Sequence, residues 1–431
     1  MTDVQLAITD PRPQRYLTDA PGVGGTIKAR PDDFMVDEQP LYEPCGSGEH
    51  LYLHIEKVNV SHGEMMAVLQ KHFNVDENAI GFAGMKDKHA VTRQLVSIYL
   101  PRPAPPVELA HDRIRVLWSD RHTNKLRRGH LAGNRFVIRI REVDPMQAPQ
   151  ALKTLRQLER AGVPNYFGFQ RFGYRLNNHK LGAMYLAGQW QAALDELLGS
   201  TGSPYPEYQQ PRRELYDAGQ YDDAAALWTA SDRTERTAIN ALRKTGSPRD
   251  AMLAIGRTAL NFWVSALQSA IFNRVLDVRI DAGTLGVLED GDLAWKHDSG
   301  AVFAVTAREI GSGELPPRLE RLEISPSGPL WGRSMTRADG EVGQRELDAL
   351  HAAGLQLSDF NTGQVTLRGA RRPLRVPITD GQLDAGVDEH GPFIRLAFDL
   401  PRGAYATIAL REIMKSPGAE TSPDAAESRA D

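Results

Sequence analysis

The chain of 431 residues contains a single cysteine, Cys45, so it cannot form an intramolecular disulfide bond or a metal site built from several thiolates. No stretch approaches eighteen consecutive apolar residues, which argues against a membrane-spanning helix. The first residues, MTDVQLAITDPRPQRY, have no basic segment followed by a long apolar run, so we expect no secretory signal. These absences favour a protein of the reducing cytoplasm.

Motifs for nucleotides and metals are also missing. There is no GxxxxGKS/T loop for a nucleoside triphosphate and no GxGxxG turn for a dinucleotide. His50 and His54 lie four residues apart beside Glu49, but the order is not HExxH, and a strand-like pattern does not give the helical spacing of such a zinc site. We therefore expect no metal.

The composition is that of a globular protein, with 41% hydrophobic and 25% charged residues, and the length favours two or three domains. A net charge of −4 does not by itself indicate a nucleic-acid partner. The charge is uneven, however, because residues 121–141 contain seven Lys or Arg residues and no Asp or Glu. This stretch is either a solvated face or a contact for phosphates.

The first part of the chain alternates apolar and polar residues, which predicts strands. HLYLHIEKV (50–58) fits a half-buried strand, and in NRFVIRIREV (134–143) the apolar residues share one side while the arginines share the other. Ser61, with Glu64 three residues later, predicts a helix that begins just before MMAVLQKHF.

Between two strand-like runs, FAGMKDKHAVTRQ (82–94) forms a charged turn in which Asp87 stands between Lys86 and Lys88. Such loops are where a rigid scaffold commonly presents functional groups. One interpretation is a surface turn with weak ion pairs. The other is a carboxylate that neighbouring cations keep ionised, as a nucleophile or base. The sequence neighbours alone do not decide between them.

Other residues also have two interpretations. Phe136 fits core packing with its apolar neighbours, but its ring could also stack on a nucleobase. Asn134 could close a turn with Gly133, and Lys28 by itself is an exposed lysine on a strand.

The pattern changes along the chain and predicts an α+β fold. Residues 162–370 are helix-rich at first and later broken by Gly and Pro, while strand-like patterns return near the end. We therefore expect the two ends to build one sheet domain and the middle to be an inserted second domain. The strongest helix is 258–280, whose apolar residues at helical spacing are Leu260, Val264, Leu267, Ile271, Val275 and Val278. The last residues, 416–431, predict a disordered tail.

Two long motifs resemble those of one enzyme family. FAGMKDKHAVT (82–92) resembles the active-site segment of the TruD family of pseudouridine synthases, and GVPNYFGFQRFG (162–173) resembles its second signature. The resemblance covers about residues 15 to 415. Further similar segments are IKARPDDFMVDE (27–38), LRRGHLAGNRFVIRIRE (126–142), SALQSAIFNRVL (265–276) and LPRGAYATIALREI (400–413).

The resemblance implies a mixed-sheet catalytic domain made of residues 1–160 and 371–415, with an inserted α/β TRUD domain at 162–370. It implies isomerisation of uridine to pseudouridine in tRNA, at position 13 in the D-stem and loop region. The N1–C1′ bond breaks and uracil rejoins through C5, so no cofactor is expected. The expected partner is tRNA, with other structured RNA left open, and we expect neither a membrane nor an obligate protein partner.

The resemblance also implies roles for individual residues. Asp87 corresponds to the catalytic aspartate, Asn134 and Phe136 fall on the family's NxF motif at the uracil pocket, and Lys28 falls on a basic residue near the aspartate. The expected contacts to the RNA backbone are Lys86, Lys88, Arg121, Lys125, Arg127 and Arg128.

Two other functions stay open at this point. The first is an RNA-binding protein without catalysis that keeps the fold and the basic face. The second is a glycosidase or nucleoside hydrolase, which needs a second carboxylate as general acid, for which Glu38 is the candidate. The sequence also leaves open whether Asp87 attacks C1′ or removes a sugar proton to form a glycal.

Overall fold

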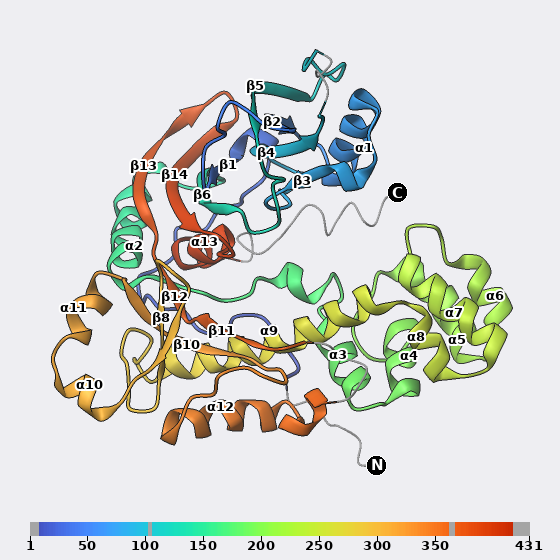
Figure 1. Ribbon diagram of the computed structural model, residues 1–431. Coiled ribbons are helices and arrows are strands. Elements are labelled where there is room, and N and C mark those ends of the chain that lie inside the picture. The colour runs from blue at the N-terminus through green and yellow to red at the C-terminus, as the bar shows by residue number, and fades with distance from the viewer. Residues whose placement is uncertain (1–7, 102–105, 362–366, 417–431) are drawn as a thin grey trace. The chain divides into compact units, whose positions relative to one another are not determined.

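The computed structural model describes residues 8–101, 106–361 and 367–416 (Figure 1). Contacts divide the chain into two compact units. We call residues 18–163 and 376–416 the sheet unit, and residues 8–17 and 164–375 the helical unit. The chain passes from one to the other at β7 (Val163–Pro164) and β12 (Arg375–Val376).

The predicted domain division can be compared with the two units at both ends of the chain. The prediction grouped the N-terminal residues with the catalytic domain, whereas residues 8–17 group with the helical unit. The reason is a set of polar contacts to a long helix of that unit, described below. The predicted disordered tail (416–431) lies outside the described residues except for Ser416.

In the described residues, the sheet unit contains one eight-stranded sheet. Its strand order is β13-β14-β6-β1-β4-β2-β5, and β3 pairs with β4. The β1–β4 pair is parallel, and the other pairs described for this sheet are antiparallel, so the sheet is mixed. Its strands are β1 (Phe34–Pro40), β2 (His50–Val58), β3 (Ile80–Phe82), β4 (Val91–Tyr99), β5 (Ile114–His122), β6 (Leu131–Arg141), β13 (Thr379–Asp388) and β14 (Gly391–Pro401).

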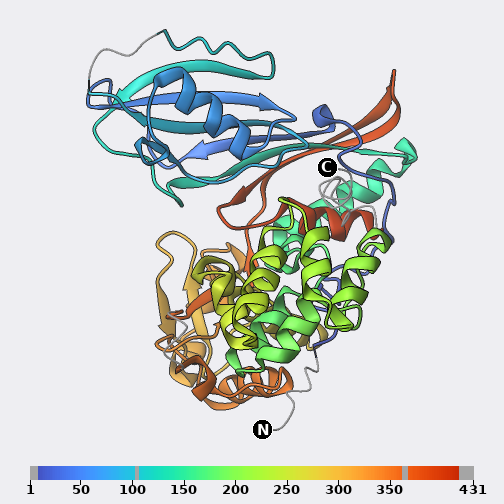
Figure 2. The ribbon, with the colours of Figure 1, turned by 90° about the vertical axis from the view of Figure 1, so that its right-hand side faces the viewer.

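Helix α1 (His62–Phe73) covers part of this sheet. The Ser61 hydroxyl accepts a hydrogen bond from the Glu64 main-chain N–H at 3.1 Å, which confirms the predicted helix start. Buried Met65 and Leu69 of α1 pack in one core with residues of β2, β3 and β4. Figure 2 shows α1, in blue, lying across these strands. The short 3₁₀ helices η1 (Pro31–Asp33) and η2 (Glu77–Ala79) lead into β1 and β3.

In the sheet unit, the segment before β1 lies against the last helix. After η3 (Pro145–Gln147), α2 (Ala148–Ala161) packs against β13, and α13 (Ala406–Met414) packs against α2. The main-chain N–H groups of Val23 and Gly24 donate to the carbonyl groups of Ile413 and Met414. The segment before β1 is therefore tied to the last helix.

The helical unit is arranged around α9 (Arg257–Asp281), which packs against α3, α12 and β10. Most of the predicted apolar stripe on α9 is buried, but Val278, near its C-terminal end, is 48% exposed. The other helices are α3 (Asn178–Leu186), α4 (Trp190–Leu198), α5 (Gln210–Asp217), α6 (Tyr221–Leu227), α7 (Arg233–Thr245), α8 (Pro248–Ala254), α10 (Ala307–Gly311), α11 (Leu315–Glu320) and α12 (Gly340–Ala352), with 3₁₀ helices η4 (Phe169–Phe172), η5 (Glu207–Gln209) and η6 (Leu357–Asn361).

An antiparallel sheet completes the described part of the helical unit, in the order β11-β10-β8-β9. Its strands are β8 (Leu293–Lys296), β9 (Val302–Ala304), β10 (Ile324–Leu330) and β11 (Ala370–Pro373). The predicted α+β class with a mixed sheet is confirmed. Within the described ranges, none of the helices combines the length and the apolar content needed to cross a membrane.

Buried His179 and half-buried His297 of the helical unit predict a loss of stability in mild acid. His179 Nε2 lies 3.0 Å from the carbonyl oxygen of Ile8, and His297 Nε2 lies 2.9 Å from Ser325 Oγ. Burial lowers the pKa of both imidazoles from 6.5 to about 4. The unfolded chain therefore binds protons that the folded chain does not, and stability falls as the pH drops from about 6.5 towards 4.

Thermal melts between pH 7.5 and about 4.5 check this expectation. We expect Tm to fall steadily with pH, and we expect His297→Asn to make the decline shallower. His351→Asn, at an exposed position, is the matched control and should leave the decline unchanged. A Tm that stays constant over this range would contradict the assignment.

Candidate active site on the sheet unit

One face of the eight-stranded sheet carries two of the predicted site residues. Directly paired residues on neighbouring strands place their side chains on the same face. The register aligns one row across the sheet: Lys57, Thr92, Val36, Phe136 and Phe398. Asn134 lies two residues from Phe136 along β6 and therefore shares this face.

Asp87 lies in the loop between β3 and β4, residues 83–90, and its side chain is 35% exposed. Lys28 Nζ donates a hydrogen bond to Asp87 Oδ2 at 2.6 Å, and the Lys28 side chain is only 3% exposed. The same ammonium lies 4.5 Å from the centroid of the Phe34 ring. A partly accessible carboxylate is therefore paired with a buried cation.

The backbone of Lys28 supports this pairing. Its φ of +58° is in the left-handed region, which is uncommon for a residue with a side chain. Such a conformation persists where surrounding contacts favour it. Lys28 is thus a buried partner of Asp87, and the interpretation as an exposed lysine on a strand is wrong.

Lys86 points into the protein. Its side chain is 6% exposed, and Nζ lies 2.6 Å both from Glu38 Oε2 and from Asn134 Oδ1. Glu38 is also buried, and its Oε1 accepts a hydrogen bond from the main-chain N–H of Leu95 at 3.3 Å. A buried, paired ammonium is poorly placed to meet a phosphate, so this geometry does not favour the predicted RNA contact of Lys86. Lys86 instead attaches the β3–β4 loop to β1 and β6.

This geometry bears on the hydrolase alternative. That alternative needs a carboxylic acid that can donate a proton to a leaving group. Glu38 has both oxygens engaged, by Lys86 and by a main-chain N–H, and its side chain is 1% exposed. It is therefore poorly placed to serve as a general acid.

Phe136 belongs to the core and also faces the site. It is 7% exposed, and its ring centroid lies 6.4 Å from that of Phe34 and 5.8 Å from that of Phe398. Because Phe34 also contacts the Lys28 ammonium, a continuous set of contacts joins Phe136 to Asp87. The structure thus brings together Asp87, Lys28, Asn134 and Phe136.

Sequence reasoning missed Lys57. It is 0% exposed, and its Nζ donates to the carbonyl oxygens of Asp87 and Val60, each at 2.7 Å. A signal was present in the sequence, because Lys57 continues the alternation of Leu53 and Ile55 and so occupies a core-facing position.

The residues expected to contact the RNA backbone lie in different environments. Arg127 and Arg128 are exposed in the segment between β5 and β6. The Gly129 N–H donates to the Ala83 carbonyl at 2.8 Å, which places this segment against the start of the β3–β4 loop. Arg402 Nη1 donates to the Gly129 carbonyl at 2.8 Å. Arg402 is thus a further cation at this edge, one that sequence reasoning did not single out.

Three other residues were expected to contact the RNA backbone: Lys125, Arg121 and Lys88. Lys125 Nζ donates to the Asn78 carbonyl, and Arg121 Nη1 donates to the Leu100 carbonyl. Lys88 is half-buried beside Asp87. None of these contacts by itself removes the charge from the surface, because main-chain carbonyl groups are neutral acceptors.

The arginines along β6 are arranged differently, since acids pair with them. Arg135 Nη1 lies 3.0 Å from Asp399 Oδ1, and Arg141 contacts both Asp33 at 2.6 Å and Asp388 at 2.7 Å. The Arg141 guanidinium lowers the pKa of Asp388 to about 2. The charge of this part of residues 121–141 is therefore largely neutralised within the protein.

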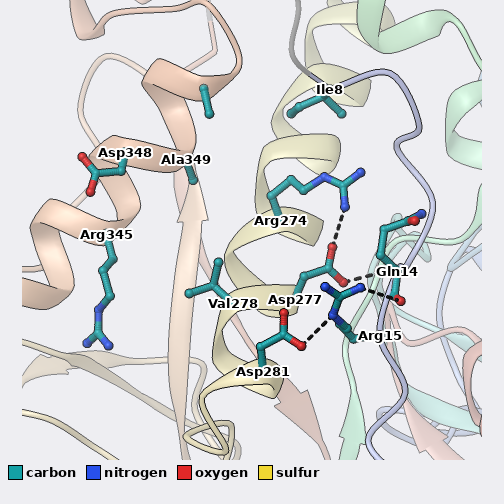
Figure 3. Close-up of a pocket in the computed structure, with 11 residues that line it drawn as sticks. Ile8, Gln14, Arg15, Arg274, Asp277, Val278, Asp281, Arg345, Asp348 and Ala349 are labelled. Carbon is teal, nitrogen blue, oxygen red and sulfur yellow. Dashed lines mark hydrogen bonds and ion pairs between the residues drawn. The ribbon is translucent and has the colours of Figure 1, made fainter.

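A pocket of about 610 Å³ lies in the helical unit, against α9 and α12 (Figure 3). Arg274 Nη1 contacts Asp277 Oδ2 at 2.8 Å, and the Gln14 N–H donates to Asp277 Oδ1 at 3.1 Å. Arg15 Nε contacts Asp281 at 2.6 Å. The contacts of Gln14 and Arg15 bind the N-terminal segment to α9, which explains why residues 8–17 belong to the helical unit.

The α+β fold with its mixed sheet is shared with a solved structure described as a tRNA pseudouridine synthase D. The chain belongs to the tRNA pseudouridine synthase D (TruD) family, because the model of that family matches residues 13–413.

Individual relatives agree with this assignment. The chain is 43% identical over 412 residues to the tRNA pseudouridine synthase D of Geobacter sulfurreducens, which covers 95% of this chain and 98% of the relative. It is 38% identical over 404 residues to that of Syntrophotalea carbinolica, covering 93% and 99%. A solved structure from Methanosarcina mazei, described as a tRNA pseudouridine synthase D, superposes with a TM-score of 0.80 at 27% identity and covers 95% of this chain and 98% of its own.

Proposed function

We propose that this protein converts uridine to pseudouridine in tRNA, at position 13, with Asp87 as the catalytic carboxylate. The observation that carries the proposal is the pair formed by partly exposed Asp87 and buried Lys28, 2.6 Å apart, in a chain of the TruD family. The name of the family and those of the relatives give the reaction and the class of RNA. The reaction would take place in the cytoplasm, where tRNA is found.

The substrate uridine must leave its stack to reach the carboxylate, which costs a few kcal/mol. The Phe136 ring offers a surface on which uracil regains part of that stacking. Asp87 then either attacks C1′, displacing N1, or takes a sugar proton to form a glycal. After uracil turns, C5 bonds to C1′ and loses its proton, while N1 ends protonated. Atoms and electrons balance within the nucleotide, so no co-reactant is needed.

Asn134 is suited to recognising a carbonyl group of uracil. Lys86 has only donors, so its contact with Asn134 Oδ1 fixes which end of the amide is the oxygen. The Nδ2 end is then free of that contact and can donate to a uracil oxygen. Cytosine carries an amino group in place of one of those oxygens, which such a donor would repel.

Product analysis tests the proposed function. A tRNA transcript is incubated with the full-length protein, and pseudouridine is mapped by carbodiimide modification, with a transcript carrying cytidine at position 13 as the control. We expect pseudouridine at position 13 in the first transcript alone. Release of free uracil would indicate a hydrolase, and tight tRNA binding without any product would indicate a non-catalytic RNA-binding protein.

Arg127 and Arg128 are exposed in the segment that contacts the β3–β4 loop, and they predict how tRNA binding depends on salt. We expect Arg127→Ala/Arg128→Ala to weaken tRNA binding and to reduce the slope of log K against log salt by about 1 to 2, because two phosphate contacts are lost. Arg135→Ala is the matched control, since Arg135 is already paired with Asp399. Binding titrations at several salt concentrations measure both. Equal slopes for the double variant and the wild type would remove these arginines from the interface.

A further inference from the structure

Lys57 is a buried cation that the reaction as described does not use. It lies on β2, is 0% exposed, and donates to two main-chain carbonyl groups at 2.7 Å. An ammonium group is unfavourable in a protein interior unless hydrogen bonds replace its hydration. The two carbonyl groups therefore make the charge tolerable at this position.

Both acceptors belong to segments that determine where Asp87 lies. Val60 directly precedes Ser61, the N-cap of α1, and the second acceptor is the carbonyl of Asp87 itself. Lys57 thus joins β2, the start of α1 and the β3–β4 loop through one group. The loop is fixed at residue 87 and not merely where it meets the strands.

Two lysines therefore hold Asp87, one at its main chain and the other at its side chain. Lys57 binds its main-chain carbonyl, and Lys28 binds its carboxylate Oδ2 at 2.6 Å. The first contact sets the position of the backbone, and the second sets the direction of the side chain. This precision matters, because a displacement of about 1 Å at a reacting group can lower a rate about 10²-fold.

We propose that Lys57 is a positioning residue for this reaction: its buried ammonium fixes the main chain of Asp87 so that the carboxylate meets the extruded uridine beside Lys28. The proposal rests on the proposed function, since it takes Asp87 to be the reacting group. A lysine with a purely structural role would stabilise the fold and leave the rate per folded molecule unchanged.

The test compares Lys57→Met with Leu69→Ala in the full-length protein. Lys57→Met keeps the apolar stem and removes the charge and the donors. Leu69→Ala truncates a fully buried side chain of α1 and so destabilises the core that contains Val60, whose carbonyl group Lys57 binds. Single-turnover rates at saturating enzyme, tRNA affinity and Tm are measured for both. We expect Lys57→Met to react about 10²-fold more slowly with unchanged affinity, and Leu69→Ala to stay within about twofold of wild type per folded molecule.

A second readout is the double variant with Asp87→Asn. If Lys57 acts through Asp87, Lys57→Met/Asp87→Asn has the same residual rate as Asp87→Asn alone. A Lys57→Met rate within about threefold of wild type, equal rate losses in Lys57→Met and Leu69→Ala, or a further loss in the double variant would overturn the proposal. If Asp87→Asn itself reacts at the wild-type rate, the proposed function fails instead.

If Lys57→Met does not fold, Lys57→Gln is a second variant that tests the proposal. Gln retains an N–H donor but carries no charge and is shorter, so it cannot reach both carbonyl groups as Lys57 does. We expect a slowed single-turnover rate with intact tRNA affinity. A rate equal to that of the wild type would overturn the assignment.

Discussion

Replacing Asp87 with Asn is expected to lower the single-turnover rate of pseudouridine formation by at least ~10³-fold. The amide has nearly the same shape as the carboxylate but lacks the charge needed to act as a nucleophile or as a base. The Lys28 ammonium can still donate to the amide oxygen, so the fold should stay intact. Affinity for tRNA should also change little, because Asp87 is an acid and does not attract phosphates.

Asp37→Asn is the matched control for this experiment. Asp37 is another carboxylate of the same sheet, 44% exposed, and it pairs with Arg93 and not with Lys28. Register places it opposite Arg135, so it faces away from Phe136. Carbodiimide mapping over the time of a wild-type turnover should show wild-type pseudouridine with Asp37→Asn and only a trace with Asp87→Asn. Equal product from the two variants would show that Asp87 is not the reacting group.

The sheet that carries the site could be predicted from local pattern. Alternation along β6 placed Phe136 on the apolar side and the arginines on the other, and the register shows this arrangement. The Ser61 cap could be predicted too, since its hydroxyl and Glu64 are close in sequence. Such features depend on neighbours within a few residues, which the sequence displays directly.

The partners of the loop cations could not be predicted in the same way. Lys86 looks like a surface residue in the sequence, but Glu38 and Asn134 are brought to it by strands far away along the chain. Lys28 likewise meets Asp87 across 59 positions. Ion pairs of this kind are fixed by tertiary packing, and the local sequence does not record them.

The chain ends illustrate the same limit. The strand, helix, strand order along the chain predicted that both ends build one sheet domain, and the main-chain N–H groups of Val23 and Gly24 donate to carbonyl groups of α13. The first described residues behave differently, since Gln14 and Arg15 bind carboxylates of α9. A few polar contacts decide where a short segment docks, and they leave no periodic pattern in it.

Replacing Phe136 with Leu is expected to slow the reaction by about 5- to 150-fold, the equivalent of losing one stacking contact worth about 1–3 kcal/mol. Leu keeps much of the volume, so the free energy of unfolding should fall by only about 1 kcal/mol. Phe136→Ala would be less informative, because a residue that is 7% exposed would lose about 3–5 kcal/mol of stability on truncation.

Phe398→Leu separates stacking on the substrate from packing in the core. Phe398 is the direct neighbour of Phe136 in the same row, with ring centroids 5.8 Å apart, but it is 0% exposed. Its replacement should lower Tm to a similar extent and leave turnover nearly unchanged, because no substrate reaches its ring. Single-turnover rates and melts of the two variants decide the matter. If both variants slow the reaction in proportion to their loss of stability, the Phe136 ring serves the core alone, and uracil must be held by Asn134 and the loop.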